Sequence, residues 1–437
     1  MQRQKTVAKW LAIILLCTVA VGAYIMYDAL YVDGGGQASA GADGGGNETP
    51  VPDPEPDPPY YTTLPRVSQS YGGQKVAHAG GEGNDVFCET VFTAQSTLMF
   101  FSSDSLEFDC RGEGLYVAVF SDSQLNAVTR FADKGDIVFS KFTADGTVVL
   151  TKHSDGNKLR LFDADGRQNG LADFPEFTTA AAYSAGTSTY IFYTDTQGLK
   201  CAVLSEGMQL EKSAFYLPET DHSVVETFPV AGGVLLFTAT SEGNVAIVRF
   251  TQKQGFSIQK VYTNTELLQI VPLAGEEGTA YAMLGKTADG GVLTVLNAEG
   301  AQEASAALGS LDGAVIFSDG ISVTLVRSGV TETYCRHLDL ISSKPNSVNF
   351  GKVLYVRNSQ DARLFAVSLV QSTEIYMLDG SDELKSLVSL PAQDVEKLTA
   401  AVRGGSVDIA FSTAYAQDVC YQNFGKSDCF LLSVNIA

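Results

Sequence analysis

The feature that most constrains the fold of this chain is a repeated order of short apolar segments. From about residue 86 to the C-terminus, runs rich in Val, Ile, Leu, Phe, Tyr and Thr alternate with turns rich in Gly, Asp, Ser and Asn. No long stretch carries helical periodicity, so the pattern predicts an all-β domain of antiparallel strands. Examples of these runs are IVFSKF, TVVLTK, STYIFYT, GVLLFTAT, NVAIVRF and GVLTVLN.

The runs recur in groups of four, each group having the same order of strands and turns. The unit DIVFSKFTADGTVVLTKHSDGNKLRLFDADGRQNGLADF has this layout, and similar units follow it. That length, roughly 40 to 46 residues, is typical of one four-stranded blade of a β-propeller. The predicted units begin near residues 94, 136, 178, 223, 267, 313, 353 and 398.

A single unit of this kind exposes both faces of its sheet, so it is stable only when stacked around a ring. We predict about eight blades, with seven as the alternative because the first unit is irregular. The chain ends soon after the last unit, so we expect the strand near DVFCETVF to complete the final blade as its outer edge. Two packed β-sandwiches are an alternative fold, but they would not explain one strand order repeated along the chain.

The N-terminus carries a candidate membrane span. Residues 10–27 form an uncharged run of 18, which is long enough to cross a hydrocarbon core of about 30 Å as a helix. Three basic residues precede the run, and the first charges after it are acidic, so the N-terminus is predicted to be cytoplasmic. We predict a cytoplasmic tail over residues 1–9 and a transmembrane signal anchor over 10–31. The protein would then be a single-pass protein of the cell membrane.

Two other readings of this segment are a cleaved signal peptide and a lipoprotein signal. The run is longer than the usual apolar core of a signal peptide, and its best small-residue site, around Ala20 to Ala23, lies inside it. A lipoprotein signal would need small residues before Cys17, where Leu15 and Leu16 stand instead. An uncleaved anchor is therefore the prediction.

A linker is predicted over residues 32–69. Its Gly/Ala/Ser part is typical of a flexible coil, whereas Pro50 to Pro59 favours extended polyproline II. Six acidic side chains and no basic one lie between Asp33 and Pro59, so the segment should resist lying on anionic lipid. We expect a disordered spacer, followed by an extracytoplasmic propeller domain over residues 70–437.

The charge balance limits the partners. The formal net charge is -21, from 29 Lys and Arg against 50 Asp and Glu, so the protein repels nucleic acid and anionic polymers. No nucleic-acid partner is expected. The membrane, reached through the N-terminal helix, and an envelope protein or peptide ligand remain as predicted partners.

Six of the seven cysteines follow the anchor and lie where disulfides can persist. Cys201 and Cys335 occupy the third strand of units three blades apart, too far for a disulfide, so both are expected to be buried thiols. The other four cysteines suit disulfides at the two ends of the domain. Closure of the ring could instead bring Cys88 near Cys420 and Cys429. The disulfide candidates are Cys88 with Cys110 and Cys420 with Cys429.

Known catalytic and metal-binding signatures are absent from the sequence. It contains no GxSxG, no GxxxxGK[ST], no HExxH and no paired CxxC motif, so the catalytic residues are unknown and no metal or cofactor is predicted. The histidines show no ligand spacing, and His222, which has acidic neighbours, is the best functional candidate among them. Among loop carboxylates, nothing selects a pair. The histidines are His78, His153, His222 and His337, and the carboxylates considered are Asp104, Glu276, Glu277 and Asp408.

The segment KLRLFDADGRQNG resembles a calcium loop at first sight, but its ligand pattern fails. Counted from Asp163, Arg167 falls at the fifth position and Gln168 at the sixth, where a calcium loop has a ligand and a glycine. We therefore predict a tight turn between the two outer strands of a blade. The equivalent turn glycines are predicted to be Gly166, Gly207, Gly255, Gly300 and Gly380.

The hairpins LFDADGRQ, VLNAEGAQ and MLDGSDEL resemble the outer hairpins of PQQ-like and other divergent bacterial propellers. The resemblance, to a PQQ-like or WD40-like repeat architecture, spans about residues 94–437. The only tryptophan, Trp10, lies in the predicted anchor. The Trp-bearing repeat signatures of WD40, kelch, quinoprotein and sialidase propellers therefore cannot occur. The resemblance implies a fold and transfers no catalytic residue.

Together these observations favour a membrane-anchored extracytoplasmic propeller that acts as a binding or scaffold module for a protein, peptide or cell-envelope ligand. Loops on a rigid ring are where such sites are placed. The alternative is a propeller-fold hydrolase or lyase that uses loop carboxylates, possibly with calcium.

Overall fold

The computed structural model describes residues 66–67, 74–78, 85–103, 113–218, 221–275, 278–311, 313–348, 350, 352–357, 363–369, 372–390, 395, 398–403, 405–414 and 427–436. All of them belong to one compact unit that begins at Tyr61. The predicted tail and anchor lie outside the described residues, as does most of the predicted linker. Within the described part, no helix has both the length and the apolar character that crossing a membrane requires.

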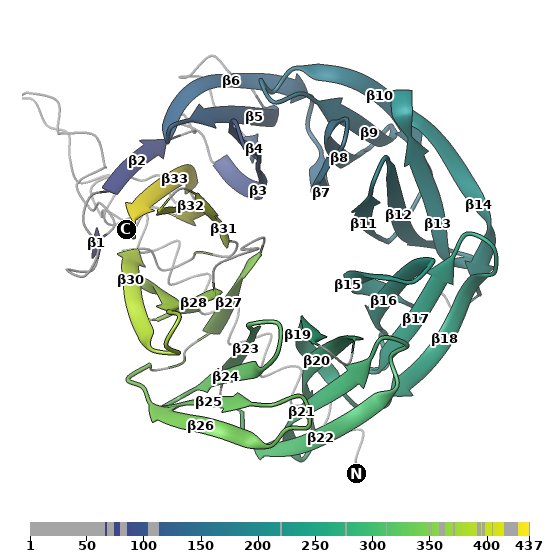
Figure 1. The fold of residues 1–437 in the computed structure, drawn as a ribbon. Coiled ribbons are helices and arrows are strands. Elements are labelled where there is room, and N and C mark those ends of the chain that lie inside the picture. The colour runs from purple at the N-terminus through teal and green to yellow at the C-terminus, as the bar shows by residue number, and fades with distance from the viewer. Residues whose placement is uncertain are drawn as a thin grey trace, which may run out of the picture. The chain divides into compact units, whose positions relative to one another are not determined.

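The described unit is a ring of eight four-stranded antiparallel blades (Figure 1), which confirms the predicted fold and blade number. The first strand of each blade lies at the centre of the ring and the fourth lies at the perimeter. Blades 1 to 4 are β3 (Asp85–Phe92), β4 (Thr97–Ser103), β5 (Gly114–Ser121) and β6 (Gln124–Ala132); β7 (Asp136–Thr143), β8 (Gly146–His153), β9 (Gly156–Phe162) and β10 (Gln168–Phe174); β11 (Thr179–Ala185), β12 (Ser188–Asp195), β13 (Gly198–Ser205) and β14 (Gln209–Leu217); and β15 (Ser223–Val230), β16 (Gly233–Ala239), β17 (Val245–Thr251) and β18 (Gly255–Tyr262).

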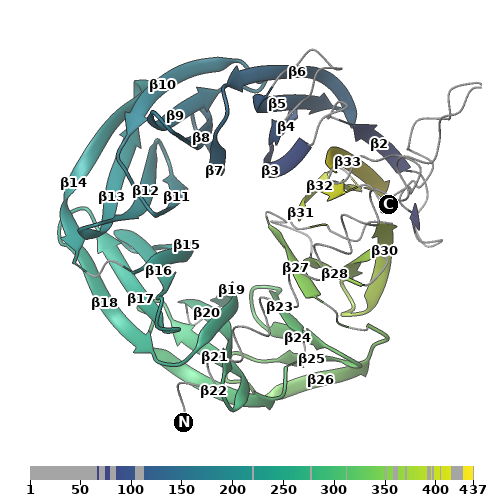
Figure 2. The same cartoon turned by 180° about the vertical axis from the view of Figure 1, so that it is seen from behind.

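The second half of the ring repeats this arrangement, as the reverse view shows (Figure 2). Blades 5 to 8 are β19 (Glu266–Gly275), β20 (Gly278–Thr287), β21 (Gly290–Asn297) and β22 (Gln302–Gly309); β23 (Ala314–Ser318), β24 (Val323–Arg327), β25 (Val330–Tyr334) and β26 (Leu340–Pro345); β27 (Lys352–Arg357), β28 (Arg363–Ser368), β29 (Thr373–Leu378) and β30 (Leu384–Leu390); and β31 (Leu398–Arg403), β32 (Ser406–Ala414), β33 (Ser427–Asn435) and β2 (Gln74–His78).

Seven of the eight predicted starting points agree with the structure to within one residue, since the first strands of blades 2 to 8 begin at 136, 179, 223, 266, 314, 352 and 398. The first blade begins at 85 rather than near 94, and the prediction for ring closure was wrong. The strand DVFCETVF is β3, the inner strand of blade 1, whereas β2 completes blade 8 by pairing antiparallel with β33. The strand β2 has the sequence QKVAH, in which only Val and Ala are apolar, so its composition does not mark it as the strand that completes the last blade.

Two further pairings occur beside the closure. The short strand β1 (Arg66–Val67) pairs with β30 and adds a strand to the outer edge of blade 7. The inner strands β27 and β31 meet in a short parallel contact, which joins blades 7 and 8 into one nine-stranded sheet.

The hydrophobic core is divided into eight clusters, one at each interface between neighbouring blades. Between blades 4 and 5, for example, Phe237 packs against Tyr281 with ring centroids 5.9 Å apart. Burial on both faces of a blade explains why its middle strands read as continuous apolar runs rather than alternating patterns. Each large side chain buried in this way contributes about 1.5–3 kcal/mol.

The segment KLRLFDADGRQNG contains the turn between β9 and β10, as predicted. The amide of Asp163 donates to the carbonyl of Arg167 (3.0 Å), and the amide of Gly166 donates to the carbonyl of Asp163 (3.1 Å). The carboxylate oxygen Oδ1 of Asp163 accepts the amides of Asp165 (3.0 Å) and Arg167 (2.8 Å). The carboxylate therefore holds the turn together.

The same turn recurs in the outer hairpins of blades 5 and 7. Asn297 uses its Oδ1 to accept two backbone amides in blade 5, and Asp379 does so in blade 7. Gly300 occupies the left-handed position at φ 82°, but in blade 7 that position is taken by Asp382 at φ 57°. Gly380 was therefore the wrong choice of turn glycine for blade 7.

We expect Asp379→Ala to lower the free energy of unfolding by about 1–2 kcal/mol, because Oδ1 accepts the amides of Ser381 and Glu383 and the Ser381 hydroxyl. Asp379→Asn should cost less, since Asn297 already performs this role in blade 5. Urea titration at pH 7 measures both. An Asn variant as unstable as the Ala variant would contradict the role assigned to Oδ1.

The turn should also be sensitive to acid. Burial acts to raise the pKa of Asp379, but hydrogen bonds from Lys385, Ser381 and two backbone amides outweigh it and hold the pKa well below its usual range. A lowered folded pKa contributes stability that is present above the unfolded value near 3.9 and is lost as the pH falls toward the folded pKa. The stability difference between wild type and Asp379→Asn should therefore shrink as the pH falls below about 4.

Candidate binding site

The order of strands defines two ends of the ring. In an antiparallel blade, the first–second and third–fourth connections lie at one end, and the second–third and between-blade connections lie at the other. We call the first of these the hairpin end. It carries the turn Asp163–Arg167 and the β7–β8 hairpin, and it also carries the depression described next.

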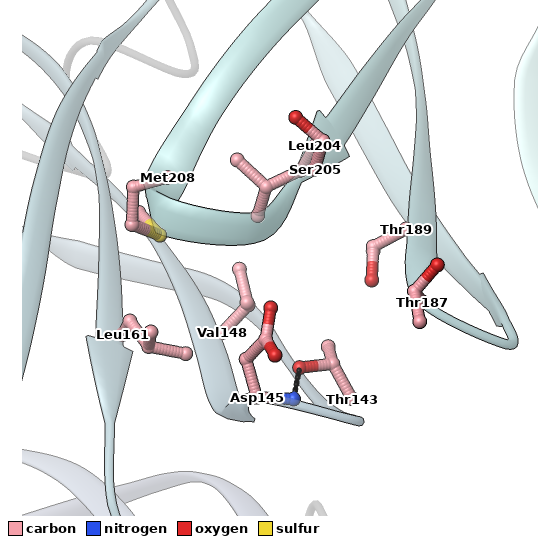
Figure 3. A pocket seen from close by; sticks show the side chains of 9 residues that line it. All are labelled: Thr143, Asp145, Val148, Leu161, Thr187, Thr189, Leu204, Ser205 and Met208. Atoms are coloured by element: carbon pink, nitrogen blue, oxygen red, sulfur yellow. Dashed lines mark hydrogen bonds between the residues drawn. The ribbon is translucent and has the colours of Figure 1, made fainter.

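A shallow depression, partly open to solvent, lies between blades 2 and 3 at the hairpin end (Figure 3). It combines an apolar lining with four hydroxyl groups and one carboxylate. The side chain of Asp145 points into the space, and the hydroxyls of Thr187 and Thr189 lie across it. The lining residues are Thr143, Asp145, Val148, Leu161, Thr187, Thr189, Leu204, Ser205 and Met208.

The β7–β8 hairpin positions Asp145. The Thr143 hydroxyl donates to the carbonyl of Gly146 (3.0 Å) and accepts the amide of Asp145 (3.3 Å), which locks the turn. Gly146 has φ 136°, and a Cβ there would come within 2.3 Å of the carbonyl oxygen of Phe162, so only glycine fits. Asp145 is thereby held at an exposed rim above the buried Thr143.

The opposite wall comes from blade 3. A short 3-10 segment, η1 (Glu206–Met208), joins β13 to β14 and carries two residues at positive φ, Gly207 at 70° and Met208 at 62°. The Ser205 hydroxyl donates to the carbonyl of Gln209 (3.3 Å) and tightens this turn. Met208 packs over Gly170 of blade 2, since a Cβ added at Gly170 would lie 2.6 Å from Cγ of Met208. The wall is apolar and adaptable, since Met conforms to varied shapes.

This lining is suited to binding rather than to acid–base chemistry. Its only titratable side chain is Asp145, whereas glycoside hydrolysis, for example, needs two carboxyl groups about 5–10 Å apart. The enclosed space is only about 10 Å³, room for about one water molecule, so the depression does not enclose a ligand. It can contact one side chain of a ligand at the surface of the ring.

His222, the best histidine candidate from sequence, is 2% exposed between β14 and β15. Its Nδ1 lies 2.8 Å from the hydroxyl of Thr238, and its carbonyl accepts the hydroxyl of Thr194 (2.5 Å). These contacts tie blade 3 to blade 4. His153 likewise bonds locally to Thr151 and to the carbonyl of Lys134.

Of the four carboxylates considered from the sequence, the structure describes only Asp408. Asp408 is 5% exposed within β32, and its Oδ2 lies 3.9 Å from Nε of Arg403. Arg403 in turn donates to the carbonyls of Thr93 and Ser96 in blade 1, so this pair belongs to the closure of the ring. Asp104, Glu276 and Glu277 lie outside the described residues.

The disulfide pairings stay predictions. Cys429 is buried in β33, opposite Ser412 of β32, and Cys88 lies at an irregularity of β3 between Phe87 and Glu89. Cys110 and Cys420 lie outside the described residues.

The two cysteines expected to be buried thiols differ. Cys201 and Cys335 are both free, which agrees with their placement three blades apart. Cys201 is buried in β13, and burial raises the pKa of its thiol. Cys335 is only half-buried, because it begins the outer turn of blade 6, where its amide donates to the carbonyl of Asp339.

None of the residues of the depression was predicted from the sequence. Seven of the nine come from FTADG, AGTST and LSEGM, which read as ordinary turns, and Val148 and Leu161 come from strands. A usable signal was the concentration of Thr and Ser in hairpins of two adjacent units that share an end of the ring.

Comparison with known proteins identifies the fold but not a family. No family model and no curated protein matches the sequence. Among solved structures, the Dos1 propeller is 10% identical with a TM-score of 0.52, covering 83% of this chain and 95% of its own. A streptogramin B lyase is 14% identical with a TM-score of 0.43, covering 68% and 93%. A putative 6-phosphogluconolactonase from Bacteroides fragilis is 11% identical with a TM-score of 0.42, covering 70% and 93%. At these identities the likeness concerns the fold alone, so the chain is a divergent eight-bladed β-propeller without a specific family.

Proposed function

We propose that this protein is a membrane-anchored, extracytoplasmic binding module that holds a protein or peptide ligand at the hairpin end of its ring. The observation that carries the proposal is the depression between blades 2 and 3, with its apolar lining, four hydroxyls and single carboxylate. The anchor predicted over residues 10–31 would hold the module at the cell membrane.

The chemistry of the depression favours a Lys or Arg side chain of the ligand. Leu161 and Met208 can cover the apolar stem of such a side chain, and Asp145 can accept its charged end. Hydrogen bonds to charged groups contribute about 1.5–3 kcal/mol, and the net charge of -21 attracts cationic ligands over longer distances.

A peptide array read with the full-length protein in detergent micelles tests the proposal. We expect binding to be enriched on peptides containing Lys or Arg. Ser205→Trp should weaken binding of the best peptide by at least about tenfold, because the indole covers the depression. Thr196→Trp is the matched control, because Thr196 is exposed in the β12–β13 connection at the opposite end of the ring.

Two results would oppose the proposal. Unchanged affinity of the Ser205→Trp variant would remove the depression from the binding site. Cleavage of the bound peptide by the wild type would show an enzyme instead of a binding module.

A further inference from the structure

We propose that the ring-closing interface holds a buried water molecule that bridges Thr90 of blade 1 to Thr399 and Asp408 of blade 8. This hydration site is independent of the depression and of the proposed function. It rests on the positions and the unsatisfied hydrogen-bonding atoms of these three residues.

The register of blade 8 places two of the residues on the face toward blade 1. Thr399 of β31 lies opposite Ala410 of β32, and opposed residues share a face of the sheet. Ala410 packs in the cluster between blades 8 and 1, with Met99 and Leu431. Asp408 is two residues before Ala410 on β32, so it lies on the same face.

The third residue faces them from the inner strand of blade 1. Thr90 of β3 lies opposite Met99, which belongs to the same cluster between the blades. The next residue along β3, Val91, packs on the opposite face, in the cluster with blade 2. Thr90 is therefore directed toward blade 8.

All three residues are buried and carry an atom without a partner. Thr90, Thr399 and Asp408 are 0%, 2% and 5% exposed. The hydroxyls of the two threonines and Oδ1 of Asp408 are among nine buried side-chain atoms of the described residues that have no hydrogen-bond partner within the protein. Oδ1 is the one carboxylate oxygen among the nine. Each such atom costs about 1–3 kcal/mol if it stays unsatisfied, so three at one interface indicate a bound group.

Water fits this set of atoms better than a cation does. One water can donate to Oδ1 of Asp408 and to one threonine hydroxyl and accept from the other, which gives the three hydrogen bonds typical of a buried water. Arg403 already places a positive charge beside the same carboxylate, with Nε 3.9 Å from Oδ2. A metal cation would be repelled there.

Valine replacements test the water, because valine matches the shape of threonine but cannot hold a hydrogen bond. With the water present, we expect Thr90→Val and Thr399→Val each to lower the melting temperature of the full-length protein by about 1–3 °C. The double variant should lose little more than one single variant, since either change already releases the water. The control pairs Thr90→Val with Thr151→Val, where Thr151 of blade 2 donates to the carbonyl of Lys158 (3.2 Å) and the losses should add.

Water-oxygen relaxation dispersion provides a second measurement, with one long-lived water lost in each single valine variant. A higher melting temperature in both single variants would show a dry interface and overturn the proposal. So would fully additive losses in the double variant. A melting temperature that changes when sodium is replaced by choline would identify a cation instead of water.

Discussion

A chain that begins at residue 80 should be less stable than one that begins at Tyr61 by about 3–5 kcal/mol. The five residues of β2 pair with β33, and each backbone hydrogen bond contributes about 0.5–1.5 kcal/mol net. Removing β2 therefore leaves blade 8 with three strands. It also separates the two ends of the chain that the ring holds together.

Urea titration followed by tyrosine fluorescence measures the loss. The chain that begins at Tyr61 keeps both β1 and β2 and is the control. Deletion should also promote self-association, because the unpaired edge of β33 becomes available to other chains. Equal midpoints and an unchanged elution volume would contradict closure by β2. They would agree better with β3 as the closing strand.

Gly166→Ala should lower the free energy of unfolding by about 2–4 kcal/mol. Part of this cost, about 1–2 kcal/mol, arises because φ is 74° and an L-residue is strained there. The remainder arises from packing, since the new Cβ would lie 2.6 Å from Cγ2 of Val119 in blade 1. The turn Asp163–Arg167 thus packs directly on the preceding blade.

Gly186→Ala is the matched control. Gly186 also has positive φ, 57°, but nothing lies within 4 Å of its added Cβ. The difference between the two variants therefore isolates the packing between blades. Gly300→Ala should resemble Gly166→Ala, because its Cβ would meet Ile247 of the preceding blade at 2.6 Å. Equal costs for Gly166→Ala and Gly186→Ala would show that the turn does not lock the blades.

Most of the fold could be predicted because the same order of strands and turns recurs in eight units of the sequence. Each unit needs apolar strands for burial on both faces and a tight turn such as Asp163–Arg167 between its outer strands. The closing strand could not be predicted, because β2 (QKVAH) is short and largely polar and its partner β33 lies some 350 residues away in the chain. Gly380 was misassigned because Asp382 tolerates the left-handed conformation that glycine usually fills.

The site could be predicted much less well than the fold. Asp145 and Ser205 lie 60 residues apart in turns of adjacent blades, and only the stacking of the blades brings them together. His222 looked functional because of its acidic neighbours, but the structure uses it to join two blades. A polar residue in a turn can bind a ligand or hold the turn, and its neighbours in space decide which.

The most direct test of the proposed binding function is a double-mutant cycle between Asp145→Asn and replacement of the peptide lysine by norleucine. The peptide is the best lysine-containing sequence from the array, and its affinity for the full-length protein is measured by fluorescence anisotropy. We predict that each single change weakens binding by about tenfold or more, and that the second change adds little once the first is made. Two independent, additive losses, or none at all, would contradict recognition of a cationic side chain by Asp145.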